Sequence, residues 1–127
     1  MARIGLTGLG TMGAALALNM AENGFRVAVH NRSSEKTDGF MASAGDLAGN
    51  LTATYDLETL VASIDSPRTV VIMVKAGAAV DAVIGALVPL LDAGDLIVDA
   101  GNADFNDNRR RTVSLSEEGL KFIGMGV

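Results

Sequence analysis

Three glycines near the start of the chain constrain its fold more than any other feature. Gly8, Gly10 and Gly13 have the spacing G-x-G-x-x-G within GLTGLGTMGAALALNM. The apolar run at 3–9 before them predicts a buried strand, and residues 11–23 after them predict a helix. In such a strand–turn–helix unit the glycines allow a tight turn, close approach of a pyrophosphate and close packing of the helix. The pattern therefore predicts dinucleotide binding, with a purely structural turn as the alternative.

The rest of the chain alternates short apolar runs with helical stretches. Strands are expected at 3–9, 25–30, 51–55, 69–74, 95–102 and 120–127. Helices are expected at 11–23, 33–45, 56–64, 78–91 and 104–118. This alternation with short connections favours parallel βαβ units, so we expect a doubly wound parallel sheet of about six strands, the Rossmann dinucleotide-binding fold. Because no repeat or long linker interrupts the pattern, residues 1–127 are expected to form one domain.

Composition excludes several classes of site. The chain has no cysteine, and His30 is its one histidine, so we expect neither disulfides nor a thiolate or histidine-rich metal site. The formal net charge of −5 argues against general nucleic-acid binding, which needs a basic surface. No apolar run reaches the roughly 18–20 residues that span a bilayer, so we expect no membrane span and a cytoplasmic location.

The end of the second expected strand indicates which dinucleotide is bound. An acidic residue at this place bonds the ribose 2′-hydroxyl of NAD, but here the nearest acid, Glu35, falls inside the next helix. Asn31, Arg32 and Ser33 stand there instead, and a guanidinium pairs with a 2′-phosphate that a carboxylate would repel. NADP is therefore favoured over NAD, unless Arg32 is only a solvated surface charge. For His30 we expect a satisfied ring at a strand end rather than a catalyst.

Three stretches together resemble the 6-phosphogluconate dehydrogenases, which are decarboxylating NADP enzymes of the pentose phosphate pathway. They read GLGTMGAALALNMAENGFRVAVHNRSSEKTDGF, PRTVVIMVKAGAAVDAVIGALVPLLDAGDLIVDAGNADFNDNRRR and LSEEGLKFIGMGV. The combination of V-K-A-G with D-x-G-N is far more specific than a glycine turn alone. The resemblance implies an oxidoreductase that oxidises and decarboxylates 6-phosphogluconate to ribulose 5-phosphate.

The resemblance also implies site residues at the carboxyl ends of the strands. The implied cofactor contacts are Gly8, Leu9, Gly10, Thr11, Met12, Gly13, Asn31, Arg32, Ser33, Val74, Lys75, Ala76, Gly77 and Asn102. Asn102 resembles the asparagine that touches both the nicotinamide side and the sugar acid, so it is also the candidate substrate contact. The alternatives are a surface ammonium for Lys75 and a turn former for Asn102.

The chain departs from the family pattern at several places. Gly10 stands where many members have alanine, and Ala103 lacks a hydroxyl that the family places near the substrate. Arg109–Arg111 match an arginine-rich family helix and are expected to be solvated or structural. For Asp99 and Asp104 the sequence shows no partner that would tune a carboxylate.

The family's substrate loop, lysine base, glutamate acid and helical domain follow the final GMGV, and none of them lies in residues 1–127. We therefore expect a truncated domain that binds NADP, has no catalytic residues of its own and turns over no substrate. Its last strand, lacking a following helix, is expected to leave apolar surface that promotes self-association. Two alternatives stay open: the cofactor domain of a 3-hydroxyisobutyrate-type β-hydroxyacid dehydrogenase, and a naturally short, non-enzymatic nucleotide-binding or interaction module.

Overall fold

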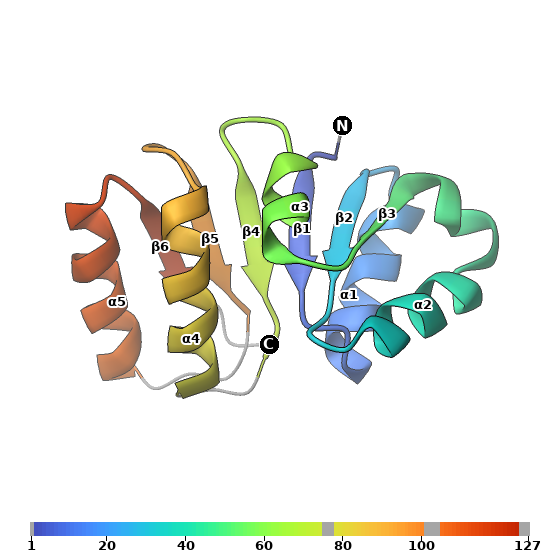
Figure 1. Cartoon of the computed structure of the whole chain (residues 1–127), viewed down its shortest axis with the longest axis horizontal. Helices are drawn as coiled ribbons and strands as arrows, with labels where there is room; N and C mark the ends of the chain where they lie inside the picture. The colour runs from blue at the N-terminus through green and yellow to red at the C-terminus, as the bar shows by residue number, and fades with distance from the viewer. Residues whose placement is uncertain (1, 75–77, 101–104, 125–127) are drawn as a thin grey trace.

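The computed structural model describes residues 2–74, 78–100 and 105–124, which contain a sheet of six parallel strands (Figure 1). The order across the sheet is β3-β2-β1-β4-β5-β6. The strands are β1 (Ile4–Thr7), β2 (Val27–His30), β3 (Leu51–Thr54), β4 (Thr69–Ile72), β5 (Leu96–Asp99) and β6 (Lys121–Gly124). This strand order confirms the predicted doubly wound sheet.

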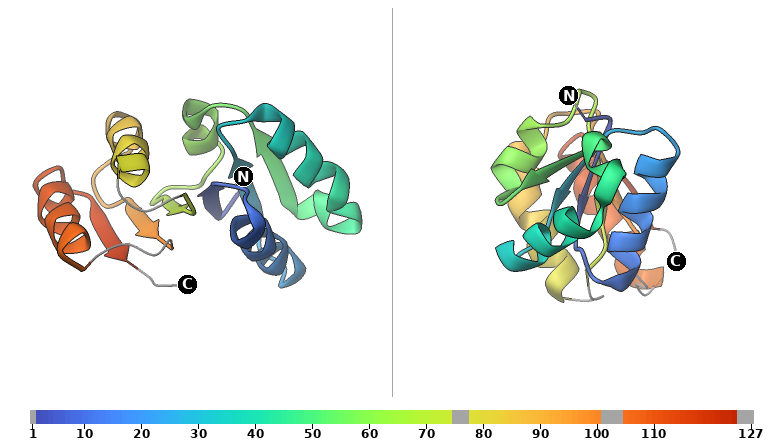
Figure 2. Two further views of the ribbon diagram at one scale, coloured as in Figure 1. Left: turned by 90° about the horizontal axis from the view of Figure 1, so that it is seen from below. Right: turned by 90° about the vertical axis from the view of Figure 1, so that its right-hand side faces the viewer.

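Helices cover both faces of the sheet. They are α1 (Thr11–Glu22), α2 (Ser34–Ser43), α3 (Leu57–Ala62), α4 (Ala78–Leu87) and α5 (Phe105–Glu117), with short 3₁₀ helices η1 (Gly45–Asn50) and η2 (Val88–Leu90). Figure 2 shows α1 and α4 on opposite sides of the sheet. One apolar cluster joins α1 and α2 to the sheet through residues that include Leu6, Ala17, Val29 and Phe40. A second cluster joins α3, α4 and α5 to the other face through residues that include Leu60, Ile84, Ile97, Leu115 and Phe122.

The expected helix at 78–91 is too long, and the reason is a proline. The structure ends α4 at Leu87 and continues with η2, which contains Pro89. Proline has no backbone N–H, and its ring clashes with the carbonyl four residues earlier, so the α-helical pattern cannot continue. The 3₁₀ helix η1 was not predicted. The end of α1 was predicted correctly from Gly24, which has φ +89°, a conformation that favours glycine after a helix.

At β6, the last strand of the sheet, one face is covered by α5 and the other is partly exposed. Phe122 is buried in the cluster beneath α5, while Ile123, its neighbour on the other face, is 48% exposed. Ile123 is the one large apolar side chain of β6 that the structure leaves exposed. Self-association through this surface stays a prediction.

The strand order reverses between β1 and β4, which lie side by side although two strands separate them in sequence. β1 is followed by a helix that leads towards β2, and β4 by a helix that leads towards β5. Their connections therefore diverge at the carboxyl edge of the sheet. In doubly wound sheets this divergence creates the crevice in which ligands bind.

Candidate cofactor-binding site

The three glycines of the turn between β1 and α1 have different structural tasks. Gly8 has φ +105°, and a Cβ there would collide with the carbonyl oxygen of Met73. A Cβ at Gly13 would collide with the carbonyl oxygen of Gly8, so this glycine allows α1 to pack against the turn. At Gly10 no described atom lies within 4 Å of the position that a Cβ would take. Gly8 and Gly13 are therefore required by the fold, while Gly10 leaves open space that a ligand can use.

The N-terminus of α1 faces this open space without a capping side chain. Gly10 is the N-cap residue, and the first turn of α1, which is described completely, contains no acidic residue. Thr11 and Met12 are exposed. The first N–H groups of a helix have no partner within the helix and carry partial positive charge, so this terminus suits a phosphate group.

The end of β2 holds the glycine turn in place through three hydrogen bonds. The Gly8 N–H donates to the carbonyl of His30 at 2.9 Å, and the Leu9 N–H donates to Oδ1 of Asn31 at 2.8 Å. Oγ1 of Thr7 and Nδ1 of His30 share a hydrogen bond of 2.7 Å. Asn31, expected only as a cofactor contact, therefore supports the turn itself. Its amide NH₂ can still donate to a ligand.

His30 is a buried, hydrogen-bonded residue, as the sequence led us to expect. Burial lowers the pKa of its imidazole, and this effect is opposed by the nearby carboxylate of Asp56, the N-cap residue of α3. The ring is thus neutral near pH 7 and bonded to Thr7.

Arg32 and Ser33 are exposed beside the turn, between β2 and α2. Arg32 forms no hydrogen bond or ion pair with any residue that the structure describes. Ser33 is the N-cap residue of α2, but its hydroxyl does not cap the helix. Both polar groups are therefore available to a ligand. A groove between α1 and α2 is lined by Ser33 together with Glu35 and Lys36. Glu35 lies inside α2, as expected, whereas Lys36 was not among the candidate residues.

The structure brings the end of β4 to the glycine turn. Cγ1 of Val74 lies 3.2 Å from the position that a Cβ on Gly8 would take, so these two candidate residues are neighbours. The other candidates implied by the resemblance fall outside the described residues, as does Asp104; these candidates are Lys75, Ala76, Gly77 and Asn102.

Asp99 has a partner that the sequence did not reveal. It is the last residue of β5, it is buried, and its Oδ2 lies 3.6 Å from Nη1 of Arg111 on α5. Nε of the same arginine donates to Oδ1 of Asp81 on α4 at 2.9 Å. Arg110, more exposed, also binds Asp81. Arg109–Arg111 were expected to be solvated or structural, and Arg111 is structural.

Other classes of site find no support in the described residues. No group of three or more His, Cys, Asp or Glu side chains in residues 2–74, 78–100 and 105–124 could hold a metal ion. None of the helices in this part of the chain has the length and apolar character needed to cross a membrane.

Comparison with known proteins gives the family. Residues 3–127 match the family model described as the NAD binding domain of 6-phosphogluconate dehydrogenase. The chain is 51% identical to the decarboxylating 6-phosphogluconate dehydrogenase of Synechococcus elongatus, over 98% of this chain and 26% of that protein. It is 47% identical to the enzyme of Trypanosoma brucei brucei, with 98% and 26% coverage. The chain thus spans about a quarter of the length of these relatives.

Solved structures agree with these matches. The 6-phosphogluconate dehydrogenase of Plasmodium falciparum, studied in its apo form and in complexes with NADP⁺ and with 6-phosphogluconate, superposes with a TM-score of 0.88 at 33% identity. The match covers 94% of this chain and 26% of that one. The 3-hydroxyisobutyrate dehydrogenase of Mycobacterium tuberculosis superposes at 0.81 but with 21% identity, over 98% and 40% of the chains, which shows a shared fold alone. The chain belongs to the family of NAD-binding domains of 6-phosphogluconate dehydrogenases.

Proposed function

We propose that this chain is the NADP-binding domain of a decarboxylating 6-phosphogluconate dehydrogenase. The observation that carries the choice of cofactor is Arg32, an exposed guanidinium that no described residue engages at the carboxyl end of β2. A 2′-phosphate at this place would meet Arg32, the unused hydroxyl of Ser33 and Lys36. Charge-assisted hydrogen bonds to phosphate are among the stronger polar contacts in proteins.

The glycine turn is proposed to hold the pyrophosphate. The open space at Gly10 admits the phosphate groups, and the exposed first turn of α1 supplies N–H donors and positive potential. His30 and Asn31 fix the turn through Gly8 and Leu9, so the donors are in place before a ligand arrives. Preformed donors reduce the entropy that binding must overcome.

The reaction of the whole protein is proposed from the family. NADP, when bound, would supply the acceptor for a hydride from 6-phosphogluconate, and the products would be NADPH, carbon dioxide and ribulose 5-phosphate. The residues of this chain are proposed to bind and orient the cofactor, with Asn102 reaching the sugar acid. Residues 1–127 contain no counterpart of the family's lysine base and glutamate acid, so we propose that the domain alone binds cofactor without turning over substrate.

The test is the replacement Arg32→Ala, with cofactor affinity measured by isothermal titration calorimetry. Loss of the charge-assisted contact is expected to weaken NADPH binding by about 1.5–3 kcal/mol, while NADH, which lacks the 2′-phosphate, loses much less. Arg26→Ala is the matched control, because Arg26 is an exposed arginine just before the opposite end of the same strand. Equal losses for NADPH and NADH in Arg32→Ala would contradict the proposed cofactor choice.

A further inference from the structure

Met12 is an exposed methionine at the place where the phosphates of the cofactor are proposed to bind. It is the second residue of α1 and is 51% exposed, although methionine is among the residues most often buried. The Cα–Cβ bonds of a helix are tilted towards its N-terminus, so the side chain of Met12 leaves the backbone on the side of the glycine turn. Its thioether is therefore accessible both to a ligand at this turn and to reagents in solution.

The other methionines that the structure describes are less accessible. Met20, Met41 and Met73 are half-buried and pack against the apolar cluster that joins α1 and α2 to the sheet. The chain has no cysteine, so its sulfur atoms all belong to methionines. Because the oxidation of sulfur follows exposure, a hydroperoxide is expected to react first with Met12 among these four residues.

Oxidation of Met12 changes the chemistry of the glycine turn. The thioether sulfur attacks the hydroperoxide, an S–O bond forms and the O–O bond breaks. Sulfur is oxidised by two electrons, and the hydroperoxide is reduced to water or an alcohol, which keeps the proton of the transferred OH group. The product is a polar sulfoxide in place of an apolar thioether, which is at most a weak hydrogen-bond acceptor. The sulfoxide oxygen can accept from the first N–H groups of α1, which have no partner within the helix, and so competes with a phosphate for them.

We propose that Met12 is a reversible modification site, at which oxidation to the sulfoxide weakens the binding of dinucleotides to the glycine turn. This inference rests on the proposed function. Because the sulfoxide acts where the pyrophosphate binds, it lowers the affinity for NADPH and NADH by the same factor, whereas Arg32→Ala acts chiefly on NADPH. Reduction by a methionine sulfoxide reductase, with two thiols oxidised to a disulfide and water released, restores the thioether.

The first test measures cofactor affinity before and after treatment with hydrogen peroxide. Mass spectrometry of peptides follows each methionine, and the treatment is stopped when Met12 is oxidised and Met20 is still reduced. Calorimetry then gives the affinities for NADPH and NADH, at a temperature at which circular dichroism shows the chain fully folded. We expect both cofactors to bind roughly three- to tenfold more weakly, and methionine sulfoxide reductase to reverse the loss.

Three variants assign the effect to one sulfur atom. In Met12→Leu the affinities before and after peroxide should be equal, whatever the affinity of the untreated variant. Met20→Leu is the matched control on the same helix and should lose affinity after peroxide as the wild type does. Met12→Gln places a polar group of similar length at this position, so without peroxide it should bind both cofactors more weakly than Met12→Leu does.

Protection by the cofactor is the second test. Saturating NADP⁺ should slow the oxidation of Met12 by about threefold or more and leave the rate at Met20 unchanged. An equal rate at Met12 with and without NADP⁺, or unchanged affinity for both cofactors after Met12 is oxidised, would overturn the inference and leave the proposed function standing. Failure of the untreated chain to bind NADPH would overturn the proposed function, and with it this inference.

Discussion

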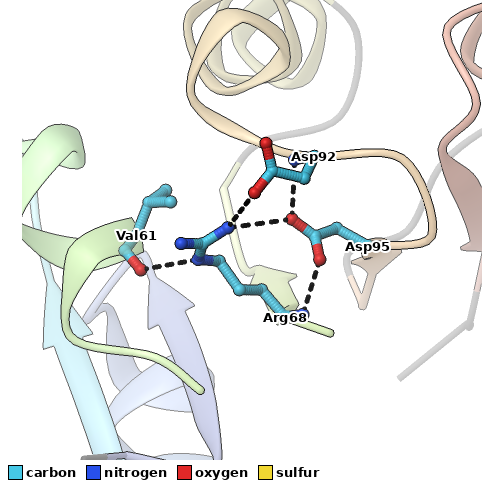
Figure 3. A network of polar contacts seen from close by, with 4 residues as sticks. All are labelled: Val61, Arg68, Asp92 and Asp95. Carbon is cyan, nitrogen blue, oxygen red and sulfur yellow. Dashed lines mark hydrogen bonds and ion pairs between the residues drawn. The ribbon is translucent and has the colours of Figure 1, made fainter. Parts of the chain in front are cut away.

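Charged side chains are arranged differently at the two ends of the parallel strands, called here the amino edge and the carboxyl edge of the sheet. At the amino edge, before β4 and β5, Arg68 binds both Asp92 and Asp95 and donates from Nε to the carbonyl of Val61 (Figure 3). The buried carboxylate of Asp95 also accepts hydrogen bonds from the N–H groups of Arg68 and Asp92. Polar groups at this edge are thus paired with one another.

At the carboxyl edge several polar groups are left open. The N-terminus of α1 has no capping side chain, the hydroxyl of Ser33 does not cap α2, and Arg32 is not engaged by the described residues. Substitutions at the amino edge are therefore expected to alter the free energy of unfolding alone, whereas substitutions at the carboxyl edge are expected to alter cofactor binding. A substitution at the carboxyl edge alters both quantities where the fold itself requires the original residue.

Gly13→Ala should have the largest effect on the free energy of unfolding, because the fold requires a glycine at this position of the carboxyl edge. Its Cβ would collide with the backbone carbonyl of Gly8, which cannot move without opening the turn. We expect a loss of about 3 kcal/mol or more in the free energy of unfolding, together with loss of NADPH binding. Urea denaturation and calorimetry measure the two quantities.

Gly10→Ala is the matched control within the same turn. No described atom lies within 4 Å of the new Cβ, so the free energy of unfolding should fall by no more than about 1 kcal/mol, the usual cost of alanine at a helix N-cap. If both variants were equally destabilised, the assignment of different tasks to the two glycines would be wrong.

Arg68→Met tests the amino edge and should have the second largest effect. It removes the ion pair of Asp95, whose carboxylate is buried, so we expect a loss of about 2–4 kcal/mol with unchanged NADPH affinity. Asp92→Ala in the same network should cost less than about 1 kcal/mol, because Asp92 is 76% exposed. A clear loss of NADPH affinity in folded Arg68→Met would break the separation between the two edges.

The smallest expected effect concerns His30 and pH. Burial holds its pKa below the ordinary value of 6.5, so as pH falls below that value the unfolded chain takes up the proton first. The free energy of unfolding should therefore decrease between about pH 7 and pH 5, until the folded-state pKa is passed. Asp56 and Asp81, whose pKa values are lowered, act at more acidic pH.

His30→Asn is the variant that isolates this contribution, since an asparagine amide atom takes the place of Nδ1, can form the hydrogen bond with Thr7 and does not titrate. Urea denaturation at several pH values should show a flatter slope for His30→Asn than for the wild type. An identical slope in both proteins would mean that His30 does not cause the pH dependence.

The architecture was predictable because its signals are local. Apolar runs such as TVVIMV predicted buried strands, and the glycine spacing predicted the turn before α1, which the structure confirms. Element ends were less certain, as the early end of α4 before Pro89 shows. The same local reasoning selected Arg32 and Ser33 as cofactor contacts; both are exposed after β2, and their contact with a cofactor stays a prediction.

The amino-acid sequence alone was sufficient to predict the alternation of strands and helices and the glycine turn, and to show that no acidic residue stands at the end of β2. Strand register decided the rest, because it brings together residues that are far apart along the chain. Asn31 supports Leu9 across 22 positions, and Arg68 meets Asp95 across 27. No sequence motif with a fixed spacing predicts either of these pairs. Their energies depend on burial and on distances of a few ångström, and only the packed sheet with its helices determines those quantities.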